Sequence, residues 1–163
     1  MSISREVLAK YVKPGMIFVE CGSRWGDTLI RAIECGAVSA FGCENDALYA
    51  SLASAHLREA CPRGNASVMC EPSTLYLRHD GYAVPSVVFL DAHTETHSPV
   101  LHELDSIARW NLSPRVILID DMRCMEGWGL SKEIIISHLK AIADYKISFE
   151  DGVVPEDIMV AQL

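Results

Sequence analysis

Short apolar runs recur along the chain, and the two most regular of them end abruptly at aspartates. Residues 86–90 are followed by Asp91, and residues 115–119 are followed by Asp120 and Asp121. Apolar runs without polar alternation are typical of strands buried on both faces of a parallel sheet. The carboxyl ends of parallel strands meet at one edge, where open α/β sheets bind ligands. The pattern therefore predicts that these aspartates converge there.

The same pattern predicts the other elements. Further strands are expected at residues 16–20, 39–43, 66–70, 145–149 and 158–162. Helices are expected at residues 4–11, 27–35, 46–60, 99–110 and 131–143, with a short helical turn at 73–77. Strands alternate with helices until the last two strands, which have only a turn between them. The prediction is an α/β fold in one domain, residues 1–163. Its sheet is doubly wound, mostly parallel and seven-stranded, with an antiparallel terminal hairpin.

Composition and charge narrow the classes of partner. The formal net charge is −8 and no run of Lys or Arg is visible, so neither nucleic acid nor an anionic membrane is an expected partner. No apolar stretch approaches the roughly 20 residues that span a bilayer, and the first residues lack the apolar core of a secretion signal. We expect a cytoplasmic chain. The cysteines form no CxxC pair and are expected to be buried free thiols, with Cys124 as the alternative reactive one.

A glycine-containing turn follows the first predicted strand. Glu20 ends that strand, and Gly22 and Gly26 allow the backbone to turn tightly and approach a ligand at a helix N-terminus. The spacing is neither that of a dinucleotide fold nor that of a phosphate loop. A strand-end acid with this wider spacing suits S-adenosylmethionine (SAM), which has a free amino group and no pyrophosphate. A plain turn between a strand and a helix is the alternative.

Glu44 ends the second predicted strand. An acid at this place can accept hydrogen bonds from both ribose hydroxyls of an adenosine. The alternative is a solvated acid that stabilises the start of the following helix near Asp46. The presence of Glu20 and the glycines upstream favours the ribose role.

Together these segments give the chain a family resemblance. Residues 19–26, 42–44, 89–93 and 118–121 resemble those of class I SAM-dependent methyltransferases, in an order and spacing that hold across nearly the whole chain. Within that class the chain resembles the divalent-metal-dependent O-methyltransferases, which include catechol O-methyltransferase and the macrolide-sugar O-methyltransferases. The resemblance implies a Rossmann-like methyltransferase fold. It also implies cofactor-binding roles for Glu20, Gly22, Ser23, Arg24, Gly26, Glu44, Ser73 and Asp91.

The resemblance further implies a metal site at the acidic edge. Its ligands would be Asp91, Asp120 and Asp121, and its ion Mg²⁺ or another divalent cation. Mg²⁺ prefers oxygen ligands, and a bound cation lowers the pKa of a substrate hydroxyl and orients it for attack. A loop turn or a helix cap is the alternative role for the Asp120–Asp121 pair. Arg123 follows this pair and could neutralise it or contact an anionic substrate.

His93 and Asp91 are the predicted catalytic residues. His93 follows the fourth strand, and an imidazole has an ordinary pKa suited to a general base. Catechol enzymes place a lysine close to this loop, where the present chain has Thr94, so the identity of the base stays open. His93 and His97 could instead join Asp91 in a Zn²⁺ or Fe²⁺ site.

The leading functional hypothesis is SAM-dependent O-methylation of an acceptor that carries neighbouring hydroxyls. One alternative is a metal-dependent hydrolase that uses Asp91, His93, His97 and Asp120, and another is a non-catalytic cofactor-binding module. A response-regulator receiver is disfavoured, because its acid pair belongs after the first strand. Few residues precede the first strand to form a lid. We therefore expect an open site for a small-molecule, glycan or peptide acceptor, or a site completed by a second subunit in a homo-oligomer.

Overall fold

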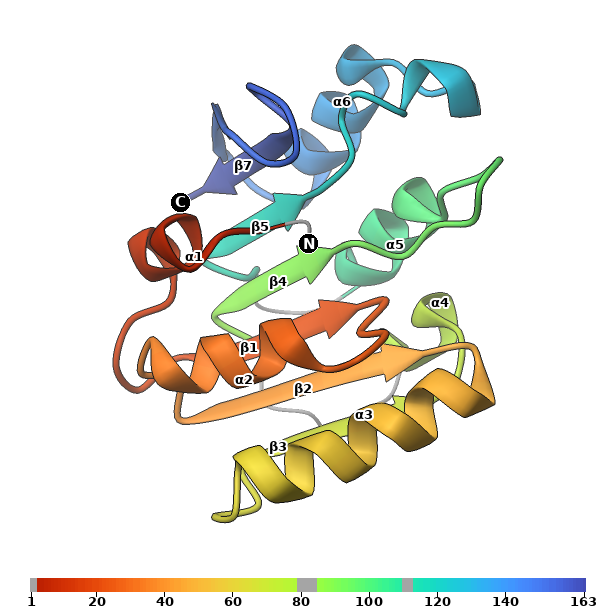
Figure 1. Cartoon of the computed structure of the whole chain (residues 1–163). Coiled ribbons are helices and arrows are strands. Elements are labelled where there is room, and N and C mark those ends of the chain that lie inside the picture. Colours follow the sequence, from red (N-terminus) through yellow and green to blue (C-terminus); the bar gives the residue numbers. More distant parts are fainter. Residues whose placement is uncertain (1–2, 79–84, 110–112) are drawn as a thin grey trace.

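One sheet organises the chain, with helices on both of its faces (Figure 1). The structure is a computed structural model, and it describes residues 3–78, 85–109 and 113–163. The strands are β1 (Ile17–Cys21), β2 (Ser39–Glu44), β3 (Ala66–Cys70), β4 (Val87–Leu90), β5 (Val116–Ile119), β6 (Lys146–Glu150) and β7 (Ile158–Gln162). The helices are α1 (Arg5–Tyr11), α2 (Asp27–Glu34), α3 (Ala47–Ala60), α4 (Ser73–Tyr76), α5 (Val100–Ile107) and α6 (Lys132–Ile142), with a 3₁₀ turn η1 (Glu126–Trp128).

The strand order confirms the predicted topology. The sheet runs β3-β2-β1-β4-β5-β7-β6. Strands β1 to β5 are parallel to their neighbours, whereas β7 is antiparallel to both β5 and β6. The terminal hairpin therefore closes the sheet as expected, with β7 inserted beside β5 and β6 left at the edge. The direction of winding reverses between β1 and β4, which is where open α/β sheets form a ligand crevice.

Alternate residues of the central strands face opposite layers of the core. Phe18, Phe89 and Leu118 pack on the side covered by α1, α2 and α3. Val19 and Val88 pack on the side covered by α4, α5 and α6. Burial on both faces explains why these strands are continuously apolar in sequence and why the chain turns polar only where each strand ends.

Most helices and strands begin and end within one or two residues of the predicted positions. The helix expected at residues 99–110 ends earlier, at Ile107, and residue 110 lies outside the described part of the chain. The η1 turn was not predicted. The expectation of buried thiols is wrong for Cys70, which is exposed because β3 is an edge strand, and Cys35 and Cys124 are only partly buried. Among the described residues no helix is long and apolar enough to cross a membrane.

Gly22 brings the ends of β1 and β4 into contact. Its φ of 86° lies in the left-handed region, and a Cβ there would stand 2.7 Å from the carbonyl oxygen of Asp91 and 2.9 Å from the Cα of Ala92. Both of these are backbone atoms, which cannot move aside like a flexible side chain. A side chain at position 22 would therefore push apart the loops that follow the two central strands.

We predict that Gly22→Ala destabilises the protein more than Gly64→Ala does. Gly64 also has a positive φ, 68°, but a Cβ there meets nothing within 4 Å. Both substitutions carry the cost of a left-handed alanine, roughly 1–2 kcal/mol, and only Gly22→Ala adds a clash of about 1–3 kcal/mol. Urea unfolding of the two variants measures the difference. Equal losses in the free energy of unfolding would contradict the close contact.

Candidate functional site

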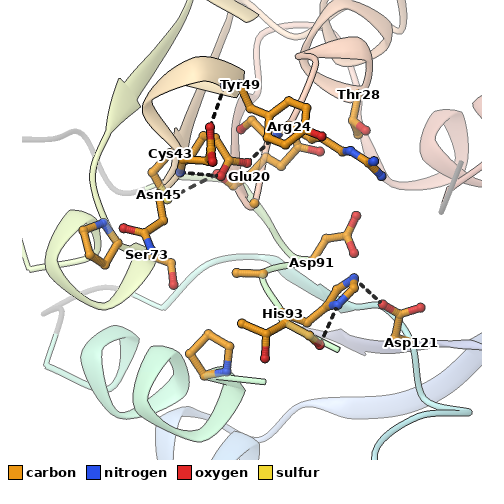
Figure 2. A pocket seen from close by; sticks show the side chains of 18 of the residues that line it. Glu20, Arg24, Thr28, Cys43, Asn45, Tyr49, Ser73, Asp91, His93 and Asp121 are labelled. Atoms are coloured by element: carbon orange, nitrogen blue, oxygen red, sulfur yellow. Dashed lines mark hydrogen bonds and ion pairs between the residues drawn. The ribbon is translucent and has the colours of Figure 1, made fainter. Parts of the chain in front are cut away.

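A cleft of about 890 Å³ runs along the carboxyl ends of the parallel strands. Its walls come from the loops that follow β1, β2, β3, β4 and β5, with Val153 added from the β6–β7 connection. The predicted cofactor residues all line this cleft except Gly26. Figure 2 shows Asp91 between two sets of residues, with Glu20, Arg24 and Thr28 on one side and His93 and Asp121 on the other. The predicted cofactor half and acidic half are therefore two ends of one cavity.

The turn after β1 is fixed by hydrogen bonds to β2. The backbone N–H groups of Gly22 and Ser23 both donate to the carbonyl of Cys43 at 3.0 Å, and the N–H of Gly26 donates to the carbonyl of Ser23 at 2.7 Å. Gly26 has a φ of 79° and precedes α2. A Cβ on Gly42 would stand 2.0 Å from the hydroxyl of Ser23, so the glycine in β2 makes room for the turn.

Glu20 is a buried acid in the wall of the cleft. Its residue is 1% exposed, and its Oε2 has no hydrogen-bond partner among the described residues. Burial raises the pKa of this carboxyl to about 7, although the hydroxyls of Thr28 and Ser23 lie close enough to favour its ionised form. A carboxylate without a cationic partner is costly to bury. A ligand ammonium in the cleft would supply that partner.

Glu44 has the structural role considered for it at the start of α3. Its Oε1 accepts from the N–H of Asp46 at 2.9 Å, next to the residue that caps α3. Its Oε2 accepts from the N–H of Arg24 at 2.9 Å, which ties the β1–α2 turn to the end of β2. A carboxylate oxygen can accept more than one hydrogen bond, so Glu44 can still bind ligand hydroxyls from the cleft wall.

His93 is held in one orientation at the other end of the cleft. Its Nδ1 lies 3.1 Å from the carbonyl oxygen of Thr94, which can only accept, so Nδ1 carries the hydrogen. Its Nε2 lies 3.1 Å from Oδ2 of Asp121. The ring stacks on Trp128 with 5.3 Å between centroids, and the indole N–H of Trp128 donates to the carbonyl of Glu95. The nitrogen available for chemistry is therefore Nε2.

Asp121 is shared between His93 and Arg123. Its Oδ1 lies 2.6 Å from a guanidinium nitrogen of Arg123, and its φ of 59° is in the left-handed region. A second nitrogen of Arg123 pairs with Asp157, a 1%-exposed residue just before β7. Arg123 therefore pairs with Asp121, one member of the predicted acid pair, and fixes the carboxylate that faces His93.

The predicted metal ligands fall into two groups. In one, donor atoms of Asp91, His93 and Asp121 lie within 4.8 Å of one another. In the other, Asp120 and Asp121 lie with Asp157. Asp120 is 2% exposed, and its Oδ1 accepts from the N–H of Asp121 at 2.8 Å, so it also fixes the turn after β5. On the cleft side, His93 rather than Asp120 completes the group.

Sequence reasoning missed Asp157 and the support that Trp128 gives to His93. The signal for Asp157 was present, because it is an acid directly before an apolar run. In an antiparallel strand the residue before the strand lies at the same edge as the residues after its parallel neighbours. His97 is exposed, lines the cleft, and accepts through its carbonyl from Thr94. It belongs to neither group of donor atoms among the described residues.

Solved structures are similar to this chain although their sequences are not. Neither the models of known protein families nor the curated proteins give a match to this sequence. The O-methyltransferase TomG from Streptomyces achromogenes, in complex with SAM, matches 99% of this chain and 81% of its own length with a TM-score of 0.74 and 15% identity. Magnesium protoporphyrin IX methyltransferase (ChlM) from Synechocystis PCC 6803, with bound SAM, matches 96% and 76% with a TM-score of 0.69 and 18% identity. An O-methyltransferase from Bacillus cereus, in complex with S-adenosylhomocysteine (SAH), matches 98% and 78% with a TM-score of 0.68 and 16% identity.

These similarities establish the fold. The chain has the Rossmann-like fold of class I SAM-dependent methyltransferases, which confirms the fold that the sequence resemblance implied. The shared architecture extends over nearly the whole chain, including the antiparallel β7.

Glu20→Gln should stabilise the protein increasingly as the pH rises above 4.5. The folded-state pKa is about 7, above the ordinary value of 4.5. Between these values the folded chain holds a proton that the unfolded chain has lost, so stability falls as pH rises. Above pH 7 the loss is complete and amounts to roughly 3 kcal/mol. Glutamine cannot ionise. The free energy of unfolding of Glu20→Gln should therefore exceed that of the wild type by roughly 3 kcal/mol at pH 8 and equal it near pH 4.5.

Urea unfolding at pH 4.5, 6 and 8 measures this effect. Glu34→Gln is the matched control, because Glu34 is an exposed acid of α2 paired with Arg5. Its difference from the wild type should not grow between pH 4.5 and 8 as that of Glu20→Gln does. A gain from Glu20→Gln that is the same at every pH would mean that charge burial at this position costs nothing.

Proposed function

We propose that this protein is a SAM-dependent methyltransferase that transfers a methyl group to an oxygen of a hydroxylated acceptor. The observation that carries the proposal is the carboxyl of Glu20, buried in the cleft wall with Oε2 unpartnered among the described residues. It stands beside a glycine turn that presents backbone close to any ligand. The names of two structural neighbours, O-methyltransferases bound to SAM and to SAH, support the same class of cofactor.

The chain offers groups for three polar parts of this cofactor. Glu20 would hold the ammonium of the methionine moiety, since it is a buried anion without a cation. Glu44 would accept from the ribose hydroxyls, since it lines the cleft at the end of β2. Ser73 begins α4, lines the cleft and is 7% exposed, and it would contact the nucleobase. No phosphate cradle is needed for such a ligand.

The residues at the other end would act on the acceptor. SAM supplies an electrophilic methyl group: a C–O bond forms, the C–S bond breaks with its electron pair left on sulfur, and the acceptor hydroxyl loses its proton. That proton would end between Nε2 of His93 and Oδ2 of Asp121, because Nδ1 already donates to Thr94. Asp121 would stabilise the protonated ring from 3.1 Å, and Trp128 fixes its plane. Asp91 lies between this pair and the cofactor half of the cleft.

A divalent cation fits the same end of the cleft. Asp91, His93 and Asp121 present donor atoms within 4.8 Å of one another, close enough to hold one ion. A cation held there would occupy Nε2 of His93 in place of the proton, and it would activate an acceptor hydroxyl by lowering its pKa and orienting it. Two oxygens with an imidazole nitrogen suit Mn²⁺, Fe²⁺ or Zn²⁺ better than Mg²⁺, which prefers oxygen alone. Arg123 already neutralises Asp121 from its other oxygen, so a cation there would bind to Oδ2.

The hydrolase alternative has less support. It needs His97 and Asp120 beside Asp91 and His93, yet neither belongs to that group of donor atoms in the described chain. A binding module without activity would not need His93 held by Thr94, Trp128 and Asp121 together. The acceptor end is open, since Val153 is 58% exposed and lines the cleft. An open end suits a glycan or peptide acceptor as well as a small molecule.

We predict that the protein binds SAM and that Glu44→Gln weakens binding by about 10-fold or more. An amide keeps one acceptor oxygen where the carboxylate had two, and hydrogen bonds to charged groups are worth roughly 1.5–3 kcal/mol. Calorimetric titration with SAM measures the change. Glu59→Gln, an exposed acid at the far end of α3, is the control and should bind like the wild type. Wild-type protein that does not bind SAM would overturn the proposed function.

Mn²⁺ should bind more tightly than Mg²⁺, and the preference should depend on His93. Calorimetry with each metal alone should show that Asp91→Asn weakens both ions. His93→Gln should remove the preference for Mn²⁺, because it replaces a nitrogen ligand with an amide. His97→Gln is the control and should bind metal normally. Loss of metal binding in the His97 variant would favour the hydrolase ligand set instead.

A further inference from the structure

Arg123 lines the cleft and pairs with two buried carboxylates. One terminal nitrogen of its guanidinium lies 2.6 Å from Oδ1 of Asp121, and the other pairs with Oδ2 of Asp157. The Arg123 side chain is 34% exposed, whereas the side chains of Asp121 and Asp157 are 8% and 0% exposed. The arginine is therefore the solvent-facing member of a group in which two acids share one positive charge.

Asp157 is fixed by backbone groups as well as by the guanidinium. Its carbonyl accepts from the N–H of Met122 at 2.9 Å. Its Oδ1 accepts from the backbone N–H of Arg123, and its Oδ2 accepts from the N–H of Val153, both at 3.2 Å. These bonds join the turn after β5 to the connection between β6 and β7. Asp157 therefore holds the guanidinium from a fixed position, although it does not belong to the cleft lining that the described residues form.

A cation in the cleft would compete with Arg123 for Asp121. The proposed ligands of that cation are Asp91, His93 and Asp121, and the last of these is the one that Arg123 already holds. A positive guanidinium repels a cation that binds to the same carboxylate. With Asp157 in place, the guanidinium divides its hydrogen bonds between two acids. Without that partner, both of its terminal nitrogens could bind the two oxygens of Asp121, in the bidentate arrangement that arginine and carboxylate prefer.

We propose that Asp157 is a positioning residue that keeps Oδ2 of Asp121 open to a divalent cation, by holding one side of the Arg123 guanidinium. This inference rests on the proposed function, because it takes Asp121 as a ligand of the cation. It assigns opposite effects to two paired residues: Asp157 strengthens cation binding, and Arg123 weakens it. A purely structural role would give the loss of either residue the same sign, since both would then loosen the same turn.

Calorimetric titration with Mn²⁺ alone tests the proposal. Asp157→Asn should weaken Mn²⁺ binding by roughly 3- to 10-fold, because the guanidinium would then pair with both oxygens of Asp121. Arg123→Gln should tighten it by roughly 10-fold, the effect of one positive charge a few ångströms from a divalent ion at a water-like dielectric. The double variant should bind like Arg123→Gln, because Asp157 acts through the arginine. Arg31→Gln is the control and should leave the affinity nearly unchanged, since Arg31 is a cleft arginine bonded to the carbonyl of Ile3.

The outcomes separate this inference from the proposed function. A wild type that binds SAM but no Mn²⁺ overturns the cation site and this inference with it, and leaves the proposed methyl transfer standing. A wild type that binds Mn²⁺ while Arg123→Gln binds it no more tightly overturns the inference alone. A double variant that binds as weakly as Asp157→Asn also overturns it, because Asp157 would then be a ligand itself, with Asp120 and Asp121. The double variant leaves no unpaired charge at position 157, so tighter or weaker binding than in the wild type decides the matter even if a single variant does not fold.

Discussion

The burial of the Glu20 carboxyl, whose Oε2 has no partner among the described residues, is the constraint on which the cleft depends. The carboxyl is buried at the end of β1, the strand that lies between β2 and β4. Ionisation of this buried carboxyl lowers the stability of the fold as the pH rises above 4.5, because no cation of the described chain pairs with Oε2. A cationic ligand would offset that cost only while bound. In the proposed function, this carboxyl therefore binds the ammonium group of the ligand.

The geometry of β1 determines what stands on either side of that anion. Register with β2 places Glu44 at one side, and register with β4 places Asp91 at the other. Gly22 allows the following loops to touch, so the two sides share one cavity. Arg123, which also pairs with Asp157, holds Asp121, and Asp121 in turn pairs with His93. The strand order therefore brings the proposed cofactor end and the proposed methyl-acceptor end of the cleft into one cavity.

Much of this could be predicted from sequence because burial and strand direction act together. Apolar runs ending in acids predicted β4 and β5 and the edge at which Asp91 and Asp121 meet. Asp157 was not predicted because β7 is antiparallel to β5, so the acid at this edge of the sheet precedes the strand and does not follow it. His93, and not Asp120, lies with Asp91 and Asp121 on the cleft side. This depends on the turn after β5, where Asp121 has a left-handed φ that the spacing of apolar residues does not encode.

The central claim is that Glu20 loses its proton when a ligand ammonium enters the cleft. Calorimetric titration with SAH at pH 7, in two buffers of different ionisation enthalpy, measures the protons released on binding. With a pKa of about 7 in the free protein, binding should release about half a proton, and Glu20→Gln should release correspondingly less. Binding without proton release in the wild type, or with equal release in Glu20→Gln, would contradict the role of Glu20.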